Sequence, residues 1–227
     1  MADGLNNNAK PTAPLVVVAE QRHLDGLVAC HCLALPNEAV TKLGRSFLRS
    51  HFRYYIRHPE GLVLVAVEQQ SGKVIGYMVG GAPWLRKRFL WTHALSLGPI
   101  ILWKALTDPV VRARLREPVP PVAQGRRPEG PAGDGWPDDP PGTVATFLFL
   151  GAHPDYRRRG ISTAILTALR AECRRRGYRA MRLKTPNTNA AAIGLYRSAG
   201  WRITGVGLRY TYFWCPTDPV DPAGDTR

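Results

Sequence analysis

Hydrophobic residues in the first quarter of the chain are spaced as in one strand followed by two helices. Residues 15–20 form a compact, largely β-branched run, which predicts a strand. Residues 21–35 repeat apolar side chains at the spacing of one helix face, and Pro36 ends this helix. Asn37 can cap a second helix, whose apolar pattern continues towards residue 56.

Two further apolar runs, residues 62–67 and 74–79, are joined by a polar turn that contains Ser71 and Gly72, and this pattern predicts a hairpin. Strand and helix patterns then alternate through the C-terminal part of the chain. The expected elements there are a strand at 144–150, a helix at 160–176, a strand at 180–184, a helix at 189–200, and an antiparallel pair at 201–206 and 208–214.

The segment between these two parts, residues 82–142, follows neither pattern. Residues 89–106 are strongly apolar and lie between two basic clusters. A histidine, a proline and a lysine interrupt this run, which barely reaches the ~20 residues that a membrane span needs. We expect buried or lid-like helices here, with contact to a membrane surface as the main alternative. Residues 117–142 are packed with Pro and Gly, which predicts a linker or mobile loop.

Composition is that of a soluble globular protein. Of the 227 residues, 44% are hydrophobic and 21% are charged. The formal net charge of +14 implies a positive field that attracts anions such as nucleotide phosphates, nucleic acid or an acidic membrane surface. Because Arg greatly outnumbers Lys in a chain that is also rich in Ala, Gly and Pro, part of this charge reflects background composition. Charge alone therefore does not favour nucleic acid as a partner.

The termini and the cysteines favour a cytoplasmic location. Residues 1–14 are polar, Asn-rich and short of basic residues, which predicts a flexible tail and not a signal peptide. Residues 217–227 are expected to form a second flexible tail. The four cysteines form no CxxC pair, and no nearby histidine completes a zinc site, so we expect free thiols in a reducing compartment and no metal centre.

Candidate chemistry is concentrated in residues 156–163, Tyr-Arg-Arg-Arg-Gly-Ile-Ser-Thr, between a predicted strand and a predicted helix. The N-terminus of a helix presents backbone N–H groups without partners, and its dipole favours negative charge. Gly160 lets a phosphate approach the backbone closely, and Ser162 is small enough to do nearly the same. The three arginines add permanent cations. The segment therefore predicts a pyrophosphate cradle, with a basic surface turn as the simpler alternative.

Four short motifs follow one another around this turn and after it. They are His153-Pro154-Asp155-Tyr156, Arg157-x-x-Gly160-x-Ser162, Asn189-x-x-Ala192-x-x-Leu195-Tyr196 and Gly200-Trp201. In this order and at this spacing, over residues 148–201, the chain resembles the GNAT superfamily of coenzyme A-dependent N-acyltransferases. Ser162 stands where the family usually has Gly or Ala. Because its side chain still fits at a helix start, we expect tighter packing around the phosphate and retained binding.

The resemblance implies an α/β fold of the GNAT type, with a central, mixed, twisted sheet flanked by helices and a helical and loop insertion between the third and fourth strands. The expected organisation is a flexible tail (1–14), the N-terminal part of an acyltransferase domain (15–81), the insertion with its Pro/Gly-rich linker (82–142), the coenzyme A-binding core (143–216) and a second tail (217–227).

It also implies a site for acetyl-coenzyme A, or another acyl-coenzyme A, as co-substrate. Backbone groups of Leu150, Gly151 and Ala152 would run beside the pantetheine arm and polarise the thioester carbonyl. The residues expected to hold the pyrophosphate are Arg157, Arg158, Arg159, Gly160, Ile161, Ser162 and Thr163. Asn189 would contact the cofactor near the reacting end, and capping its helix is a role that can coexist with this one.

Tyr196 would be the general acid by the same resemblance. When a neutral amine attacks a thioester, the intermediate collapses by expelling a thiolate, which must be protonated. A phenol with a pKa of ~10 can supply that proton to a thiolate whose acid has a pKa of ~8.5, if the site shifts the two values slightly. The alternative is an ordinary core aromatic on a helix.

The general base does not stand out by spacing. The carboxylates and imidazoles that could accept the amine proton are Glu20, Glu38, His51, Glu68 and His153. By analogy with the family, residues 33–55 would bind the acceptor, an amine of a small molecule or a peptide. We expect the insertion to form a lid or wall over this amine; an ornamental insertion or a contact within a homodimer is the alternative.

Two other functions remain open at this point. The basic and apolar stretch 86–116 is also consistent with a membrane-associated acyltransferase that acts on a lipid-linked acceptor. A non-catalytic, coenzyme A-binding regulator is the third possibility, and the intact Tyr196 argues against it.

Overall fold

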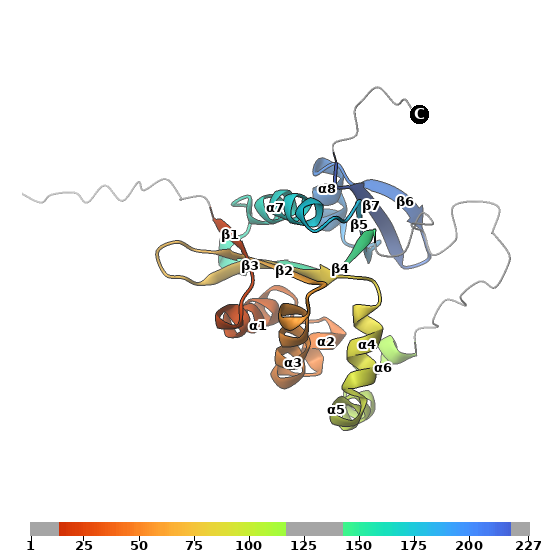
Figure 1. Cartoon of the computed structure of the whole chain (residues 1–227). Coiled ribbons are helices and arrows are strands. Elements are labelled where there is room, and N and C mark those ends of the chain that lie inside the picture. Colours follow the sequence, from red (N-terminus) through yellow and green to blue (C-terminus); the bar gives the residue numbers. More distant parts are fainter. Residues whose placement is uncertain (1–13, 117–142, 219–227) are drawn as a thin grey trace, which may run out of the picture.

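The structure is a computed structural model that describes residues 14–116 and 143–218. Its centre is a seven-stranded mixed sheet with the strand order β1-β2-β3-β4-β5-β7-β6 (Figure 1). The strands are β1 (Leu15–Val18), β2 (Gly61–Val67), β3 (Val74–Gly81), β4 (Val144–Ala152), β5 (Ala180–Pro186), β6 (Arg202–Val206) and β7 (Tyr210–Pro216). Only the β4–β5 pair is parallel among these neighbours. The expected mixed sheet and both antiparallel pairs are confirmed.

Helices cover both faces of the sheet. One face carries α1 (Leu24–Ala34) and α3 (Arg45–Arg57), whereas α7 (Ile161–Arg175) and α8 (Ala190–Ser198) lie on the opposite side (Figure 1). The alternation of side chains along a strand explains how both faces acquire a core. Along β2, for example, Leu62 and Leu64 join the cluster beneath α7, and Val63 and Val65 join the cluster beneath α1 and α3.

The second N-terminal helix is shorter than the sequence pattern predicts. The structure has a single turn, α2 (Ala39–Lys42), which is separated from α3 by Gly44. Gly44 has a φ of 99°, a value that favours glycine, and this turn of the backbone ends one helix before the next begins. Asn37 does not cap α2; the N-cap position belongs to Glu38. The prediction of one continuous helix from residue 37 was therefore wrong.

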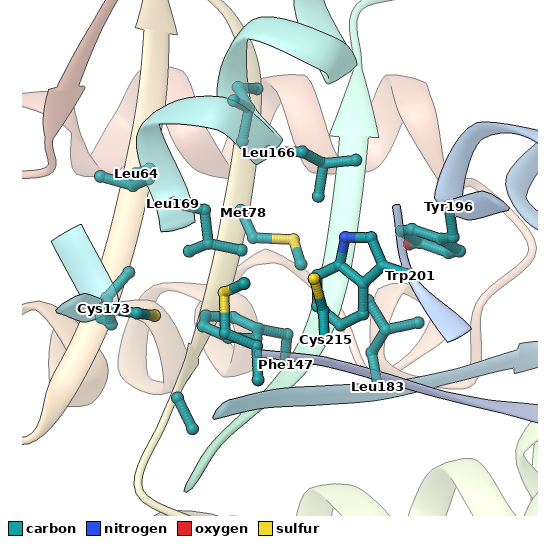
Figure 2. Close-up of a cluster of buried hydrophobic side chains, with 14 of the residues drawn as sticks. Leu64, Met78, Phe147, Leu166, Leu169, Cys173, Leu183, Tyr196, Trp201 and Cys215 are labelled. Atoms are coloured by element: carbon teal, nitrogen blue, oxygen red, sulfur yellow. The ribbon is translucent and has the colours of Figure 1, made fainter. Parts of the chain in front are cut away.

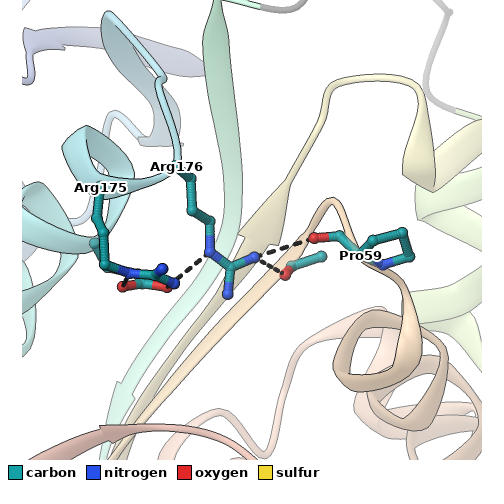
Figure 3. Close-up of polar contacts among 5 residues, drawn as sticks. Pro59, Arg175 and Arg176 are labelled. Atoms are coloured by element: carbon teal, nitrogen blue, oxygen red, sulfur yellow. Dashed lines mark hydrogen bonds and ion pairs between the residues drawn. The ribbon is translucent and has the colours of Figure 1, made fainter.

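Helix α7 is fixed to the sheet at its C-terminal end by an arginine network. The Arg176 guanidinium donates to the backbone carbonyls of Gly61 at 2.7 Å and Pro59 at 3.2 Å, next to the start of β2 (Figure 3). Glu172 accepts from both Arg175 and Arg176 at 2.7 Å. These bonds hold the helix whose opposite end carries the predicted phosphate cradle.

The insertion between the third and fourth strands contains three helices, α4 (Leu85–Thr92), α5 (Ala94–Thr107) and α6 (Pro109–Leu115). Asp108 caps α6 by accepting hydrogen bonds from the backbone of Val110 and Val111. The helices extend away from the sheet, with α5 farthest from it (Figure 1). The Pro/Gly-rich linker expected at 117–142 lies outside the described residues.

We expected these helices to be buried, but only one side of them is. Leu85, Phe89, Leu97 and Val111 are buried, but many large apolar side chains of the insertion are exposed. No single helix in the described parts of the chain is long and apolar enough to cross a membrane. One pair, Leu85–Thr92 with Leu97–Thr107, passes that test jointly, but it is bent by 97°.

The two expected tails lie mainly beyond the described residues, at 1–13 and 219–227. Thr217, at the start of the second expected tail, is buried and donates from its hydroxyl to the carbonyl of Tyr178 at 2.7 Å. The chain therefore stays attached to the core at least as far as this residue.

Candidate active site

The central strands β4 and β5 pair at one end and separate at the other. Their ladder joins Val144 to Ala180, Ala145 to Met181 and Thr146 to Arg182, and it extends no further in the described chain, although β4 continues to Ala152. Leu150, Gly151 and Ala152, which we expected beside the pantetheine arm, lie in this diverging part of β4. Their backbone groups on the β5 side can therefore pair with an extended ligand.

An irregularity in β4 adds to this divergence. Val79 pairs with Phe149 and Gly80 pairs with Phe147, so Leu148 is an extra residue between two successive pairs. A bulge of this kind bends a strand and increases its twist, and bulges are common beside functional sites. Packing requires a glycine at position 151, because a Cβ on Gly151 would lie 2.5 Å from the Tyr77 ring.

The turn between β4 and α7 has the backbone of an anion-binding loop. Arg158 has a φ of 59° and Gly160 has a φ of 73°, so two left-handed residues occur within three positions. A left-handed residue other than glycine is uncommon and costs conformational energy, and such residues gather at ligand sites. Nothing lies within 4 Å of a Cβ built on Gly160, so a ligand can approach the backbone there. The first N–H groups of α7 open onto the same turn.

The arginines of this turn surround it with positive charge. Arg157, Arg158 and Arg159 are all exposed. The Arg159 guanidinium lies 5.1 Å from the centre of the Tyr156 ring, and the Tyr156 hydroxyl donates to Glu68 at 2.9 Å. This contact orients Arg159, and the Arg157 guanidinium donates to the backbone carbonyl of Ala34 at 3.5 Å. Arg158 is exposed in the same turn, where a phosphate would arrive.

Three other predicted contacts have different environments. Ile161 is buried in the core beneath α7, so only its backbone N–H can face a phosphate. Ser162 is half-buried and Thr163 is exposed at the start of that helix. Asn189 caps α8, because its side-chain oxygen accepts from the Ala192 N–H at 3.1 Å. The structure thus gives Asn189 a structural role, which leaves room for a second contact since the residue is exposed.

Tyr196 lies on α8 with its ring inside the core. The ring lies beside Trp201 (Figure 2). Its centroid is 5.8 Å from that of Trp201 and 5.2 Å from that of Phe213. Burial raises the pKa of Tyr196, so the phenol stays protonated near neutral pH. Among the described residues no hydrogen bond reaches its hydroxyl, and this oxygen is not one of the fully enclosed unpartnered atoms. The Tyr196 hydroxyl is therefore available to a ligand.

A buried polar pair on the other face of the sheet is absent from the residues that the sequence pattern singled out. The Tyr77 hydroxyl and Nδ1 of His31 are 2.7 Å apart, and both residues are fully buried. Burial raises the pKa of Tyr77, and Cys30, Glu38 and Tyr196 raise it further through their charge. The Tyr77 ring lies directly against Gly151 of β4. The pair gave no signal in the sequence because each member occurs within an otherwise apolar pattern.

A cavity of about 430 Å³ lies at the open end of this region. It is lined by Asn37, Glu38 and Ala39 before and in α2, by Pro109, Val110, Ala113 and Arg114 of α6, and by Tyr210 at the start of β7. Tyr210 pairs with Pro186, beyond the last β4–β5 pair at Arg182, which places the cavity where the two strands have separated. The Arg114 guanidinium donates to the Tyr210 hydroxyl and also lies 5.5 Å from its ring centre.

Glu38 is the one carboxylate or imidazole among the predicted base candidates that lines this cavity. Glu20 pairs with Arg22, and Glu68 accepts from Ser71 and Tyr156. His51 is buried among aromatic rings, and His153 is buried beside Tyr156. No group of three or more His, Cys, Asp or Glu residues in the described chain could hold a metal ion.

Comparison with known sequences supports the resemblance. Residues 132–201 match the model of the acetyltransferase (GNAT) family. A stretch of 66 residues is 36% identical to the [ribosomal protein bS18]-alanine N-acetyltransferase of Escherichia coli K12. This stretch is 29% of the present chain and 45% of the relative, so the chain spans about half the length of the curated relatives it matches.

Solved structures share the fold over most of the chain. The E. coli ribosomal-protein-S18-alanine N-acetyltransferase aligns with a TM-score of 0.52 and 15% identity, covering 94% of this chain and 99% of that one. A GCN5-related N-acetyltransferase from Kribbella flavida aligns with a TM-score of 0.56 and 17% identity, covering 91% and 99%. The expected fold class, a mixed sheet flanked by helices, is confirmed.

Proposed function

We propose that this chain is a member of the acetyltransferase (GNAT) family and transfers an acyl group, most simply acetyl, from a coenzyme A thioester to an amine. The observation that carries this proposal is the divergence of β4 from β5 directly before the turn at Arg157 to Thr163. An extended arm can pair with the free side of β4, and its diphosphate then meets the left-handed turn and the first N–H groups of α7.

The residues present fit such a ligand. Gly160 leaves its backbone open, the neighbouring arginines are exposed cations, and the lack of a side chain on Gly151 lets β4 lie against the Tyr77 ring. Under this proposal Leu150, Gly151 and Ala152 bind the pantetheine arm, and residues 157–163 bind the diphosphate. Asn189 contributes a second contact beside its cap.

The reaction would be direct attack. The amine nitrogen forms a bond to the thioester carbonyl carbon, the carbon–sulfur bond breaks, and the thiolate takes the phenol proton of Tyr196. The amine loses its own proton on the opposite side. Glu38 is the candidate acceptor of that proton, directly or through water, because its carboxylate lines the cavity. Tyr196 regains a proton from solvent after release.

The acceptor would bind in the cavity between α2, α6 and the start of β7. A volume of about 430 Å³ suits a small amine or the end of a peptide. The E. coli relative is named for acetylating an alanine of a ribosomal protein, which favours a peptide amine as one acceptor class. In this arrangement α6 is the wall that we expected the insertion to provide. The four cysteines are free thiols, which is compatible with the cytoplasmic location that we also propose.

Two measurements test this function. Calorimetry should detect binding of coenzyme A to the folded protein, and Arg158→Glu with Arg159→Glu should weaken it at least ~10-fold because two cations become anions beside the diphosphate. The matched control is Arg53→Glu with Arg57→Glu, which makes the same change of charge on exposed residues of α3. Equal weakening by both double variants would show a general field effect and would contradict the cradle.

A thiol-release assay then identifies the reaction. Purified protein is mixed with acetyl- and longer acyl-coenzyme A and a panel of small amines and peptides, and free thiol is measured over time. Amine-dependent release supports the transferase. Tight coenzyme A binding without release for any acceptor would favour a non-catalytic regulator instead.

A further inference from the structure

The exposed surface of the insertion is unusually apolar. Trp91 of α4 is 82% exposed, and Leu95 and Trp103 of α5 are 96% and 65% exposed. Leu90, Leu102 and Leu106 are also exposed. We call these six side chains the insertion face. Single exposed leucines are normal on a protein surface, but six large apolar side chains exposed on two consecutive helices, two of them tryptophans, indicate a contact surface.

Helix α5 is apolar on two sides, and only one of them is covered. Leu97, Ile100 and Ile101 pack towards Phe47 and Phe89, which joins α5 to the rest of the protein. The exposed residues Leu95, Pro99, Leu102, Trp103 and Leu106 follow the spacing of the opposite helix face. A helix face that contacts water usually carries polar side chains, whereas these five exposed side chains are all apolar.

Basic residues flank the insertion face. Arg86, Lys87 and Arg88 are all exposed on α4. The sequence from Trp84 to Thr107 contains no Asp or Glu. Apolar side chains with tryptophan among them, bordered by cations, are the composition of helices that lie in the headgroup region of a membrane.

We propose that the insertion face docks onto an anionic lipid surface. Charge complementarity decides between this partner and a second copy of the chain. Two copies that meet through this face would bring two basic clusters together, and each copy carries a formal charge of +14. Anionic headgroups neutralise the same cations. The 97° bend between α4 and α5 suits helices that lie on a bilayer, and α5 is the part of the described chain farthest from the sheet (Figure 1).

Co-sedimentation with vesicles tests the proposal on the full-length protein. Vesicles of phosphatidylcholine alone are compared with vesicles that contain phosphatidylglycerol as well. The anionic vesicles should bind the protein at least ~10-fold better at low salt, and this preference should fall as the salt concentration rises. Leu95→Ser with Trp103→Ser should abolish most binding. Lys87→Glu should reduce only the preference for anionic vesicles.

The control is Leu15→Ser, which replaces an exposed leucine of the edge strand β1 and should leave vesicle binding unchanged. Coenzyme A affinity is measured for each variant, so that loss of lipid binding is separated from loss of the fold or of the proposed active site. Equal binding to both kinds of vesicle, or no binding, would overturn the proposal. So would light scattering that shows a dimer which Leu95→Ser with Trp103→Ser dissociates, because the face would then belong to a second copy.

Discussion

Tyr196 has two properties that a proton donor to a leaving thiolate needs. Its raised pKa keeps the proton on the phenol, and its hydroxyl has no hydrogen-bond partner among the described residues. The same raised pKa makes complete transfer of the proton to a free thiolate unfavourable. We therefore expect transfer to accompany cleavage of the carbon–sulfur bond, when the developing charge on sulfur is close to the phenol.

Replacing Tyr196 by Phe separates catalysis from packing. Because the ring fills the same space beside Trp201 and Phe213, the free energy of unfolding and the coenzyme A affinity should change little. The turnover number should fall ~100-fold, within the usual range for loss of a general acid. In the wild type, no loss of activity from ionisation of Tyr196 should occur below pH ~10, since burial raises the pKa of this phenol above its usual value.

The matched control is Tyr178→Phe, the same change at a buried tyrosine of the same core cluster. It should keep full turnover. A parallel loss of turnover and coenzyme A affinity in Tyr196→Phe would assign this residue a structural role only.

For single residues, the sequence predicted the features that depend on neighbours in the chain. These features are the turn around Gly160, the helix cap at Asn189 and the apolar pattern around Tyr196. The His31–Tyr77 pair joins residues that are 46 positions apart, and only the fold brings them together. Glu38 was one of five equal candidates until the cavity distinguished it.

Helix α6 is the element through which the insertion meets the proposed acceptor cavity. It supplies four of the lining residues, and Arg114 ties it to Tyr210 of β7. This contact crosses from the insertion to the C-terminal hairpin. The wall over the cavity therefore depends on a single arginine together with the packing of α6 against α2.

Arg114→Ala should loosen that wall and leave the cofactor site intact. We expect the KM for the acceptor amine to rise several-fold, because the cavity loses both a lining side chain and its link to Tyr210. The KM for acetyl-coenzyme A should stay within about twofold, since the β4–α7 turn is unaffected. Steady-state kinetics with each substrate varied in turn measures both.

Arg116→Ala is the control for this variant, because it removes the same charge from an exposed residue at the end of α6 that does not line the cavity. An unchanged acceptor KM in Arg114→Ala would refute the assignment of α6 as a wall.

The ends of helices and strands were predictable from the sequence where a single local residue determines them. Where no such residue does, they were not predictable. Gly177 and Gly200, which have positive φ values, follow α7 and α8 as the pattern indicates. The break at Gly44 was missed because apolar spacing continues on both sides of it. The divergence of β4 from β5 has no local signal at all, since both strands read as ordinary buried strands and their separation follows from the sheet as a whole.

Three apolar clusters form the core of the described part of the molecule. One lies beneath α7, one lies beneath α1 and α3, and a smaller one joins Phe47 of α3 to Phe89 and Leu97 of the insertion. His31 and His51 lie where the second and third clusters meet. The rings of both histidines contact Phe52 and Phe149. The position of the insertion thus depends on a core that contains two imidazoles.

These imidazoles should make the fold sensitive to acid. Burial lowers the pKa of His31 to about 4 and the pKa of His51 to about 3, the latter with help from His31, Arg86 and His93. Because both folded values lie below the unfolded value of ~6.5, the unfolded state binds more protons as the pH falls. The stabilisation that comes from burying the neutral imidazoles is therefore present above pH ~6.5. About 2 kcal/mol of the free energy of unfolding per histidine should be lost between pH 7 and pH 5.

His51→Phe tests this account, because phenylalanine can occupy the same aromatic cluster without binding a proton. At pH 7.5 the variant should be at least as stable as the wild type, since Nδ1 of His51 has no hydrogen-bond partner and its loss removes an unsatisfied buried atom. At pH 5 the variant should be more stable by about 2 kcal/mol, because one of the two proton-binding sites of the unfolded state is gone. Urea unfolding at the two pH values measures the difference. If the free energy of unfolding of both proteins fell equally between pH 7.5 and pH 5, His51 would be excluded as a source of the acid sensitivity.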